Sequence, residues 1–435
     1  MNLINTLRNI QSDKNRNLTA ANLKKGTTCL GIVGTADLLS VTADADAVAG
    51  DILKGKTAYV NSIKLTGTYE PENTGTGTAG GFIAPSAISF AGMTESEFDF
   101  SALDTRNVTN MANLFCNARN LLNIDVTNFS TSNVTNMASM FYGCDNTQTI
   151  NMSNLDTRNV TNMASMFAYC NNCTEIDITN LNTSSVTSMG SMFMRTNISS
   201  LNLASFDTSN VTNMASMFHS LCFKDINLDL SSFNVSKVNK MGSMFYQATK
   251  VKSINFAGWD TSNLVTASSM FTQAGVTNLD IGHFNMHKVD NMSAMFQGVH
   301  TTTLNLADWN TSNLVNTANM FSYMNSMISL YCNNWNTSKL TQAYKTFCHQ
   351  PNLVTLNIAN WNLANVTNTA QMFASCNNLS DESLNGILGV LTTVNKLSSS
   401  FRTLKNIGFT SDQAALCTTL SNWTNCEIIG WSTGY

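Results

Sequence analysis

One polar position recurs through most of the chain and holds the side chains best suited to chemistry. Its members are set 25 to 27 residues apart, and each stands between two apolar positions. Carboxylates and amides placed in this way can hydrogen-bond glycan hydroxyls, and an aromatic ring offers a sugar a face for stacking. The alternative is a solvated ladder in which Asn amides bond to flanking carboxylates. The candidate ligand-binding residues are Asp177, Asn202, Asp229, Asn255, Asp280, Asn305, Tyr331 and Asn357, and upstream members are Asp99, Asp125 and Asn151.

Residues that could support catalysis or metal binding lack the spacing that such chemistry needs. No Ser/His/Asp order or phosphate-binding loop is found, and Cys170 with Cys173 forms a CxxC without a second ligand pair. The other cysteines of the repeat behave as small apolar residues, which predicts reduced thiols. We therefore expect no enzyme, no cofactor and no metal site. The histidines, at unrelated repeat positions, are His219, His283, His287, His300 and His349.

The polar series belongs to a unit of 25 to 27 residues that occurs eleven times between Phe98 and Phe373. Each unit ends on MASMF or a variant of it, and its last phenylalanine follows an apolar anchor residue by twelve positions. A fixed period of this size is typical of a solenoid, in which neighbouring units bury one core.

The hydrophobic period changes within each unit. Apolar residues three and five positions before the anchor, such as Leu201 and Leu203, predict a short strand with one buried face. Asp, Asn or Ser after the anchor predicts a turn. Met137 and Phe141 belong to an i, i+3, i+4 stripe that predicts a short helix. The expected fold class is an α/β solenoid with one short parallel strand and one short helix per unit.

The repeat resembles a known family. Leu201 to Phe218 reads LNLASF followed by DTSNVTNMASMF, and these segments are similar to BspA-like leucine-rich repeats of bacterial surface proteins. The resemblance covers about two thirds of the chain. It implies a right-handed parallel solenoid and a role in adhesion or recognition, without naming a ligand.

A second resemblance lies before the repeat. Leu18 to Thr35 and Asp51 to Thr68 contain NLKKGTTCLGIVGT and ILKGKTAYVNSIKLTGT. These look like short modules of tail and fibre proteins in phages and prophages of gram-positive and gut bacteria, where they lie at the virion-proximal end. Within the second, Thr57–Val60 and Ile63–Thr66 predict a β-hairpin around Asn61 and Ser62.

Composition changes suggest the boundaries between domains. A Gly/Thr-rich linker precedes the repeat, and Phe98 with Phe100 is expected to supply its first strand. Beyond Phe373, Leu384, Ile387, Leu388 and Leu391 form a helical stripe. We divide the chain into a first virion-docking module (1–35), a second β-hairpin module (36–70), the linker and start of the solenoid (71–95), the leucine-rich-repeat solenoid (96–376) and a helical carboxyl-terminal cap (377–435).

Charge and hydropathy exclude several partners. Only 11% of residues are charged and the net charge is −4, so no basic surface for nucleic acid is expected. The sequence contains no run of about eighteen apolar residues, so no membrane span is expected. Neither an apolar secretory segment in MNLINTLRNIQSDKNRN nor a cell-wall sorting signal is found, although a surface adhesin is expected to carry both.

The resemblances together predict a structural protein of a phage virion, a tail fibre or other receptor-binding appendage assembled in the host cytoplasm. Residues 1–70 would contact other virion proteins, with a homotrimer as one possibility, and the solenoid would contact a host-surface glycan or protein. The alternatives are a bacterial cell-surface adhesin of the BspA-like type and a head-fibre or decoration protein of a virion.

Overall fold

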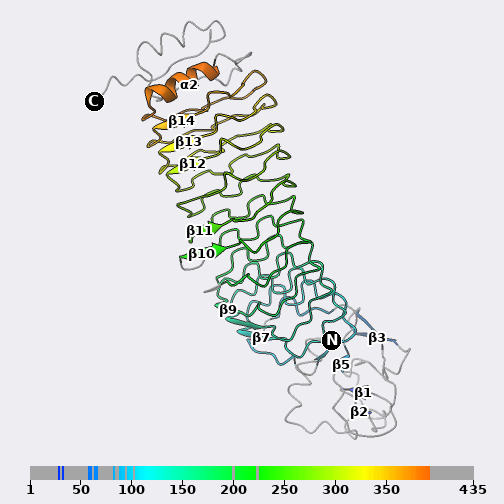
Figure 1. The fold of residues 1–435 in the computed structure, drawn as a ribbon. Helices are drawn as coiled ribbons and strands as arrows, with labels where there is room; N and C mark the ends of the chain where they lie inside the picture. The colour runs from blue at the N-terminus through cyan, green and yellow to red at the C-terminus, as the bar shows by residue number, and fades with distance from the viewer. Residues whose placement is uncertain are drawn as a thin grey trace. The chain divides into compact units, whose positions relative to one another are not determined.

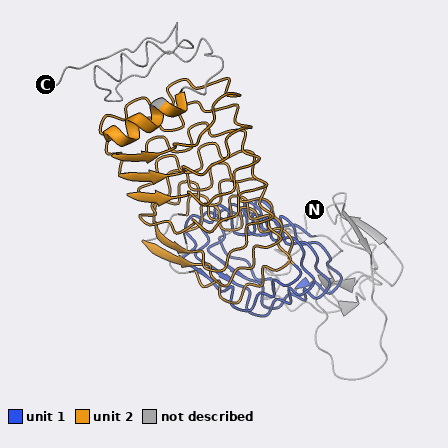
Figure 2. Cartoon of the chain, turned by 45° about the horizontal axis from the view of Figure 1, so that its top comes forward, with its two compact units in different colours: residues 1–185 blue, residues 186–435 orange. Residues whose placement is uncertain are grey.

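The computed structural model describes residues 88–93, 96–100, 103–197, 201–221 and 225–391, together with the backbone of five short strands before residue 84. The chain divides into two compact units, residues 1–185 and 186–435 (Figure 2), and each is described by itself. Both contain stacked coils, so the fold is a parallel β-solenoid with little helix. Within each unit, the short strands lie on one side of the coils that contain them (Figure 1).

The strands of the first unit form two small parallel sheets. β5 (Phe82–Ile83) pairs with β6 (Leu103–Asp104), and β8 (Thr149–Asn151) lies between β7 (Asn123–Asp125) and β9 (Glu175–Ile176). The first strand was expected at Phe98 and Phe100, but neither residue is in a strand. Phe100 is instead buried, with its ring centroid 5.0 Å from those of Phe90 and Phe115. Ring packing has therefore replaced strand pairing at this position.

The strands of the second unit are also parallel. β10 (Ile226–Asp229) pairs with β11 (Val251–Asn255), and β13 (Ser329–Tyr331) lies between β12 (Thr303–Asn305) and β14 (Thr355–Asn357). Helix α2 (Asp381–Leu391) follows β14 and lies next to it (Figure 1). These strands fall where the apolar pairs before each anchor predict them.

The short helix expected in each unit is not found in the described coils. In the first unit, Ser139 N–H donates to the Ala164 carbonyl at 2.8 Å, and Phe141 N–H donates to the Met166 carbonyl at 2.9 Å. These hydrogen bonds join successive coils, whereas a helix would bond each N–H to the residue four positions earlier. Ser139 also has a φ of 56°, a left-handed conformation that a right-handed helix excludes. The apolar stripe is therefore buried by a series of turns.

The segments at which these helices were expected form a second ladder between coils. Asn110, Asn136 and Asn162 pair as parallel bridges in the first unit. In the second unit the bridges continue from coil to coil through Ser188, Asn213, Lys240, Thr266, Asn291, Asn316, Gln342 and Asn368. Two sides of each coil are thus fixed to the neighbouring coil by backbone hydrogen bonds.

Phenylalanine rings stack along the core of each unit. In the first unit, Phe115 and Phe141 have ring centroids 5.5 Å apart and planes within 4° of parallel. In the second, consecutive rings are 5.4 to 6.1 Å apart. All are buried, at spacings that favour aromatic contact. The rings of the second unit are Phe193, Phe218, Phe245, Phe271, Phe296, Phe321, Phe347 and Phe373.

Polar side chains form the corners of each coil. The Asp207 carboxylate accepts the Ser209 N–H at 2.9 Å, and the Asn213 amide oxygen accepts the Ala215 N–H at 3.0 Å. Both are turns in which a side chain caps the backbone two residues on. The turn predicted directly after the anchor is confirmed at positions such as Asp207.

Several buried polar side chains find partners on the neighbouring coil. Trp335 Nε1–H donates to the Leu306 carbonyl at 2.7 Å, and the Thr131 hydroxyl donates to the Asp156 carbonyl at 2.9 Å. The buried thiol of Cys144 donates to the Phe115 carbonyl at 3.2 Å. Each such contact removes the desolvation penalty that an unpaired buried polar group would carry.

Two antiparallel strand pairs are described before the solenoid. β1 (Thr28–Cys29) pairs with β2 (Ile32–Val33), and β3 (Thr57–Val60) pairs with β4 (Ile63–Thr66). The second pair confirms the strands of the hairpin predicted there. The residues between β3 and β4, and the remainder of residues 1–81, lie outside the described residues.

Helix α2 begins beside the last strand of the second unit. The Ser380 hydroxyl accepts the Ser383 N–H at 3.3 Å, which caps the start of the helix. Leu384, Ile387 and Leu391 are buried on one face, as the helical stripe predicts. The side chain of Leu388 and residues 392–435 lie outside the described residues.

Candidate functional site

The polar series projects outward from the strands, and some members contact one another. Asp229 and Asn255 are register partners on β10 and β11, and the Asn255 amide donates to the Asp229 carboxylate at 3.0 Å. In the first unit, Asn151 donates to Asp125 at 3.5 Å. These are the amide-to-carboxylate contacts expected of a solvated ladder.

Three members of the series lie side by side on the last sheet of the second unit. Asn305, Tyr331 and Asn357 are register partners on β12, β13 and β14. Asn305 is exposed, whereas Tyr331 and Asn357 are half-buried. Part of the tyrosine ring therefore remains available to solvent between two amides. Asn202 and Asp280 are exposed too, and neither of these two residues lies in a strand.

Most members of the series also support the turn that follows them. The Asp177 carboxylate accepts both the N–H and the hydroxyl of Thr179, at 3.1 and 2.6 Å, and these bonds lower the pKa of Asp177. Asp229 accepts the same two groups from Ser231, and its pKa is also lowered. One oxygen of each carboxylate is therefore already engaged. The same backbone contact is made by Asn202, Asn255, Asn305 and Asn357.

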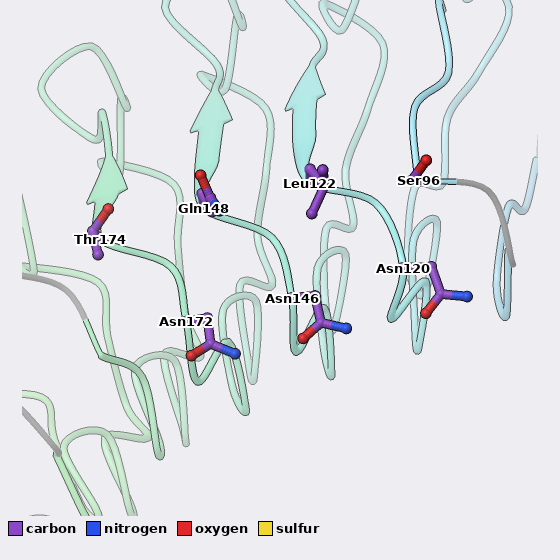
Figure 3. Close-up of a pocket in the computed structure, with 7 residues that line it drawn as sticks. All are labelled: Ser96, Asn120, Leu122, Asn146, Gln148, Asn172 and Thr174. Carbon is purple, nitrogen blue, oxygen red and sulfur yellow. The ribbon is translucent and has the colours of Figure 1, made fainter.

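A shallow groove of about 670 Å³ lies beside the ladder in the first unit (Figure 3). Its lining residues occupy two rows of successive coils, one row of asparagines in the connecting loops and one row directly before the strands (Figure 3). The asparagine row is Asn120, Asn146 and Asn172, and the strand row is Ser96, Leu122, Gln148 and Thr174.

Backbone hydrogen bonds fix the strand row of the groove. Leu122 N–H donates to the Ser96 carbonyl at 2.9 Å, Gln148 N–H to Leu122 at 2.7 Å, and Thr174 N–H to Gln148 at 3.0 Å. The spacing along this row is therefore that of a parallel sheet, about 4.8 Å. The groove wall is thus built on rigid backbone.

The lining offers amides and hydroxyls around one exposed aliphatic side chain. Within the part of the chain that the structure describes, the side chains of Asn146 and Gln148 are exposed and make no hydrogen bond. Leu122 is 36% exposed. Every lining residue is uncharged. Such a surface can hydrogen-bond a neutral polar ligand and cover an apolar patch on it.

The groove was not among the sites predicted from the sequence, although a signal for it exists. Asn120, Asn146 and Asn172 each stand nine residues before an anchor, in the loop that absorbs the length differences between units. A recurring asparagine in such a loop indicates a surface row. The sequence pattern places the ladder beside it but does not reveal a depression between them.

Cysteine and histidine side chains in the described coils have environments set by packing. Burial raises the pKa of Cys173 to about 12 and that of Cys170 well above its usual value. Cys170 donates its S–H to the Phe141 carbonyl at 3.1 Å. His219 stacks on Tyr246 at 4.7 Å, and burial lowers its pKa. No group of three or more possible metal ligands occurs among the described residues.

Across the residues that the structure describes, no helix has both the length and the apolar character needed to span a bilayer.

Comparison with known proteins identifies the repeat. A family model described as "Mycoplasma protein of unknown function, DUF285" matches residues 87–198, 168–281, 194–309, 222–333 and 292–408. No curated protein and no solved structure matches the chain. The overlapping matches cover the coils that carry both the groove and the ladder, whereas the BspA-like and phage-module resemblances remain predictions. With most of its length matched in this way, the chain belongs to the DUF285 family.

Proposed function

We propose that the chain is a structural protein of a phage virion, a tail fibre or other receptor-binding appendage whose solenoid recognises the host surface. The observation that carries this proposal is an outward strand face that is polar, regular and fixed to a stacked core. Outer carboxylates and amides of the ladder, with the half-exposed ring of Tyr331, supply many weak contacts on one rigid surface. Surfaces of this kind suit recognition of extended, repetitive ligands.

The virion assignment rests on residues 1–70. Their resemblance to modules of phage tail and fibre proteins gives them a docking role toward other virion proteins, and a homotrimer is one form in which they would assemble. The pairing of β3 with β4 is consistent with a small module of this kind. An isolated hairpin is marginally stable in water, so such a module needs neighbours.

Helix α2 is proposed as the start of a helical cap on the solenoid. The Ser383 hydroxyl accepts the Leu356 N–H at 2.9 Å and donates to the Val354 carbonyl at 3.2 Å. Both backbone groups belong to the last coil, around β14. A strand edge left open invites pairing with another chain, and α2 occupies this one.

The proposal is tested by the double variant Tyr331→Ala with Asn305→Ala. Both side chains lie on the outward strand face, so binding of the labelled chain to host cells should weaken while the melting temperature stays unchanged. Val315→Ala, an exposed change on another side of the same coil, is the control. If the double variant and the parent adsorb to host cells equally well, the ladder does not take part in recognition.

A bacterial cell-surface adhesin is the second candidate, favoured by the description of the family as a Mycoplasma protein. Antibody labelling in electron microscopy separates the two. Label on purified phage particles supports the virion assignment, and its position on tail or head separates a tail fibre from a head-fibre or decoration protein. Label on cells free of phage supports the adhesin.

A further inference from the structure

The groove of the first unit has the geometry of a linear binding site. Its two rows rise together through successive coils at intervals of about 4.8 Å. Asparagine recurs along one row, whereas the strand row changes from Leu122 to Gln148 to Thr174. Asn146 and Gln148 lie on one coil, with Asn120 and Asn172 on the coils to either side (Figure 3). Asparagine contacts are therefore repeated along the stacking direction.

The polar groups of the groove centre are open to a ligand. Asn146 and Gln148 are exposed and have no side-chain hydrogen bond within the described residues. Asn172 uses its amide N–H to bond the Asp145 carbonyl at 2.8 Å, which holds the end of the asparagine row in place. The centre of the groove thus offers amide donors and acceptors on a supported loop.

Electrostatics favour a neutral ligand. Arg119 and Asp145 directly precede Asn120 and Asn146 of the asparagine row and pair at 3.4 Å, and the exposed Glu175 follows Thr174 of the strand row. Asp145 also accepts the Asn171 amide at 2.9 Å. None of the described lining residues is cationic, so the groove itself lacks the cationic group that an anionic polymer requires.

The backbone disfavours a peptide in the same place. Addition of a peptide strand needs unpaired N–H and C=O groups, but the strand row already bonds from coil to coil through Leu122 and Gln148. An extended peptide also repeats at about 3.3 Å per residue, out of step with coils about 4.8 Å apart. The length of one pyranose ring along an extended glycan is close to that coil spacing.

We infer that this groove binds a neutral, extended polysaccharide lying along the stack. Amides of Asn146 and Gln148 bond ring hydroxyls, and Leu122 lies against the apolar face of a ring. The inference rests on the proposed function of host-surface recognition, and it adds a ligand class and a second binding surface beside the ladder.

The experiment is calorimetric titration of the full chain with cellohexaose, chitohexaose and mannohexaose, and with a polygalacturonate oligomer as anionic counterpart. At least one neutral hexasaccharide should bind, and its monosaccharide should bind far more weakly. Asn146→Ala with Gln148→Ala should weaken that binding at least about tenfold, as expected for two lost hydrogen bonds. His300→Ala with Thr302→Ala changes the same repeat positions of another coil and should leave it unchanged.

Three results would overturn the inference: no binding of any neutral hexasaccharide, binding unaffected by the groove variant, or binding of polygalacturonate alone. Matching melting temperatures of the parent and both variants show that any loss is local. Adsorption to bacterial cells separates this inference from the proposed function. If the groove variant still binds cells, the solenoid recognises the host surface without using the groove. If the parent chain binds no cells, the proposed recognition function is itself contradicted.

Discussion

At the scale of single residues, the cysteines show how position within a coil sets reactivity. Burial raises the pKa of Cys144 and of Cys376 to about 12, whereas Cys116 is half-exposed at the same turn of another coil. A raised pKa keeps a thiol protonated, and the thiol form is a poor nucleophile. Each buried thiol also donates to a carbonyl of the preceding coil.

Alkylation of the native chain with iodoacetamide at pH 8 should therefore modify Cys116 well before Cys144 or Cys376. Reactivity of the buried pair should rise only as the pH approaches 12 or the chain unfolds. Peptide mass mapping over a time course gives the three rates separately. Denatured chain, in which all three should react alike, is the control. Equal rates in the native chain would contradict the burial described for this turn.

At the scale of one element, a glycine permits close approach between two connecting loops. Gly275 lies in the short connection after Phe271, and a Cβ there would stand 2.1 Å from the Thr249 carbonyl oxygen. The atoms that it would meet all belong to the Thr249 backbone, which leaves little room for adjustment. Gly386, in α2, has nothing within 4 Å of the same added atom.

Gly275→Ala should lower the free energy of unfolding by about 1 to 3 kcal/mol, the range for overpacked positions. Gly386→Ala should raise it by about 0.5 to 1 kcal/mol, because alanine loses less backbone freedom in a helix. Urea titrations followed by circular dichroism measure both. If the Gly275→Ala chain is as stable as the parent, the backbone around Gly275 can move to accommodate a Cβ, which would contradict the close approach described here.

The strands and turns could be predicted from the sequence because their signals are local. An apolar residue on either side of Asp229 indicates a strand, and Asp207 after an anchor indicates a turn. The helix prediction failed because Met137 and Phe141 have helical spacing but bond to another coil, and a partner 25 residues away leaves no local signal. The groove was missed for the same reason, since it depends on the alignment of Asn120 with Asn146 across coils.

At the scale of the whole molecule, the repeat is expected to fold without the residues before it. Cleavage between Gly75 and Gly81 should leave residues 96–435 folded, because each coil buries its apolar side chains against neighbouring coils. Size-exclusion chromatography and a thermal melt check this. Residues 1–70 alone should associate, and light scattering of that piece measures it. An aggregated repeat fragment, or a stable monomer of residues 1–70, would contradict this division.

The hydrogen bonds between coils have a mechanical consequence. In the second unit, bonds such as that from Phe245 N–H to the Met270 carbonyl run from one coil to the next, along the stacking direction. A force applied along that direction acts on the hydrogen bonds of one coil at a time, so the coils separate one after another. Each coil that peels away releases about 25 residues of chain, so tension is relieved in small increments while the remaining coils stay folded. An appendage built on such coils would act as a shock absorber between two attached bodies.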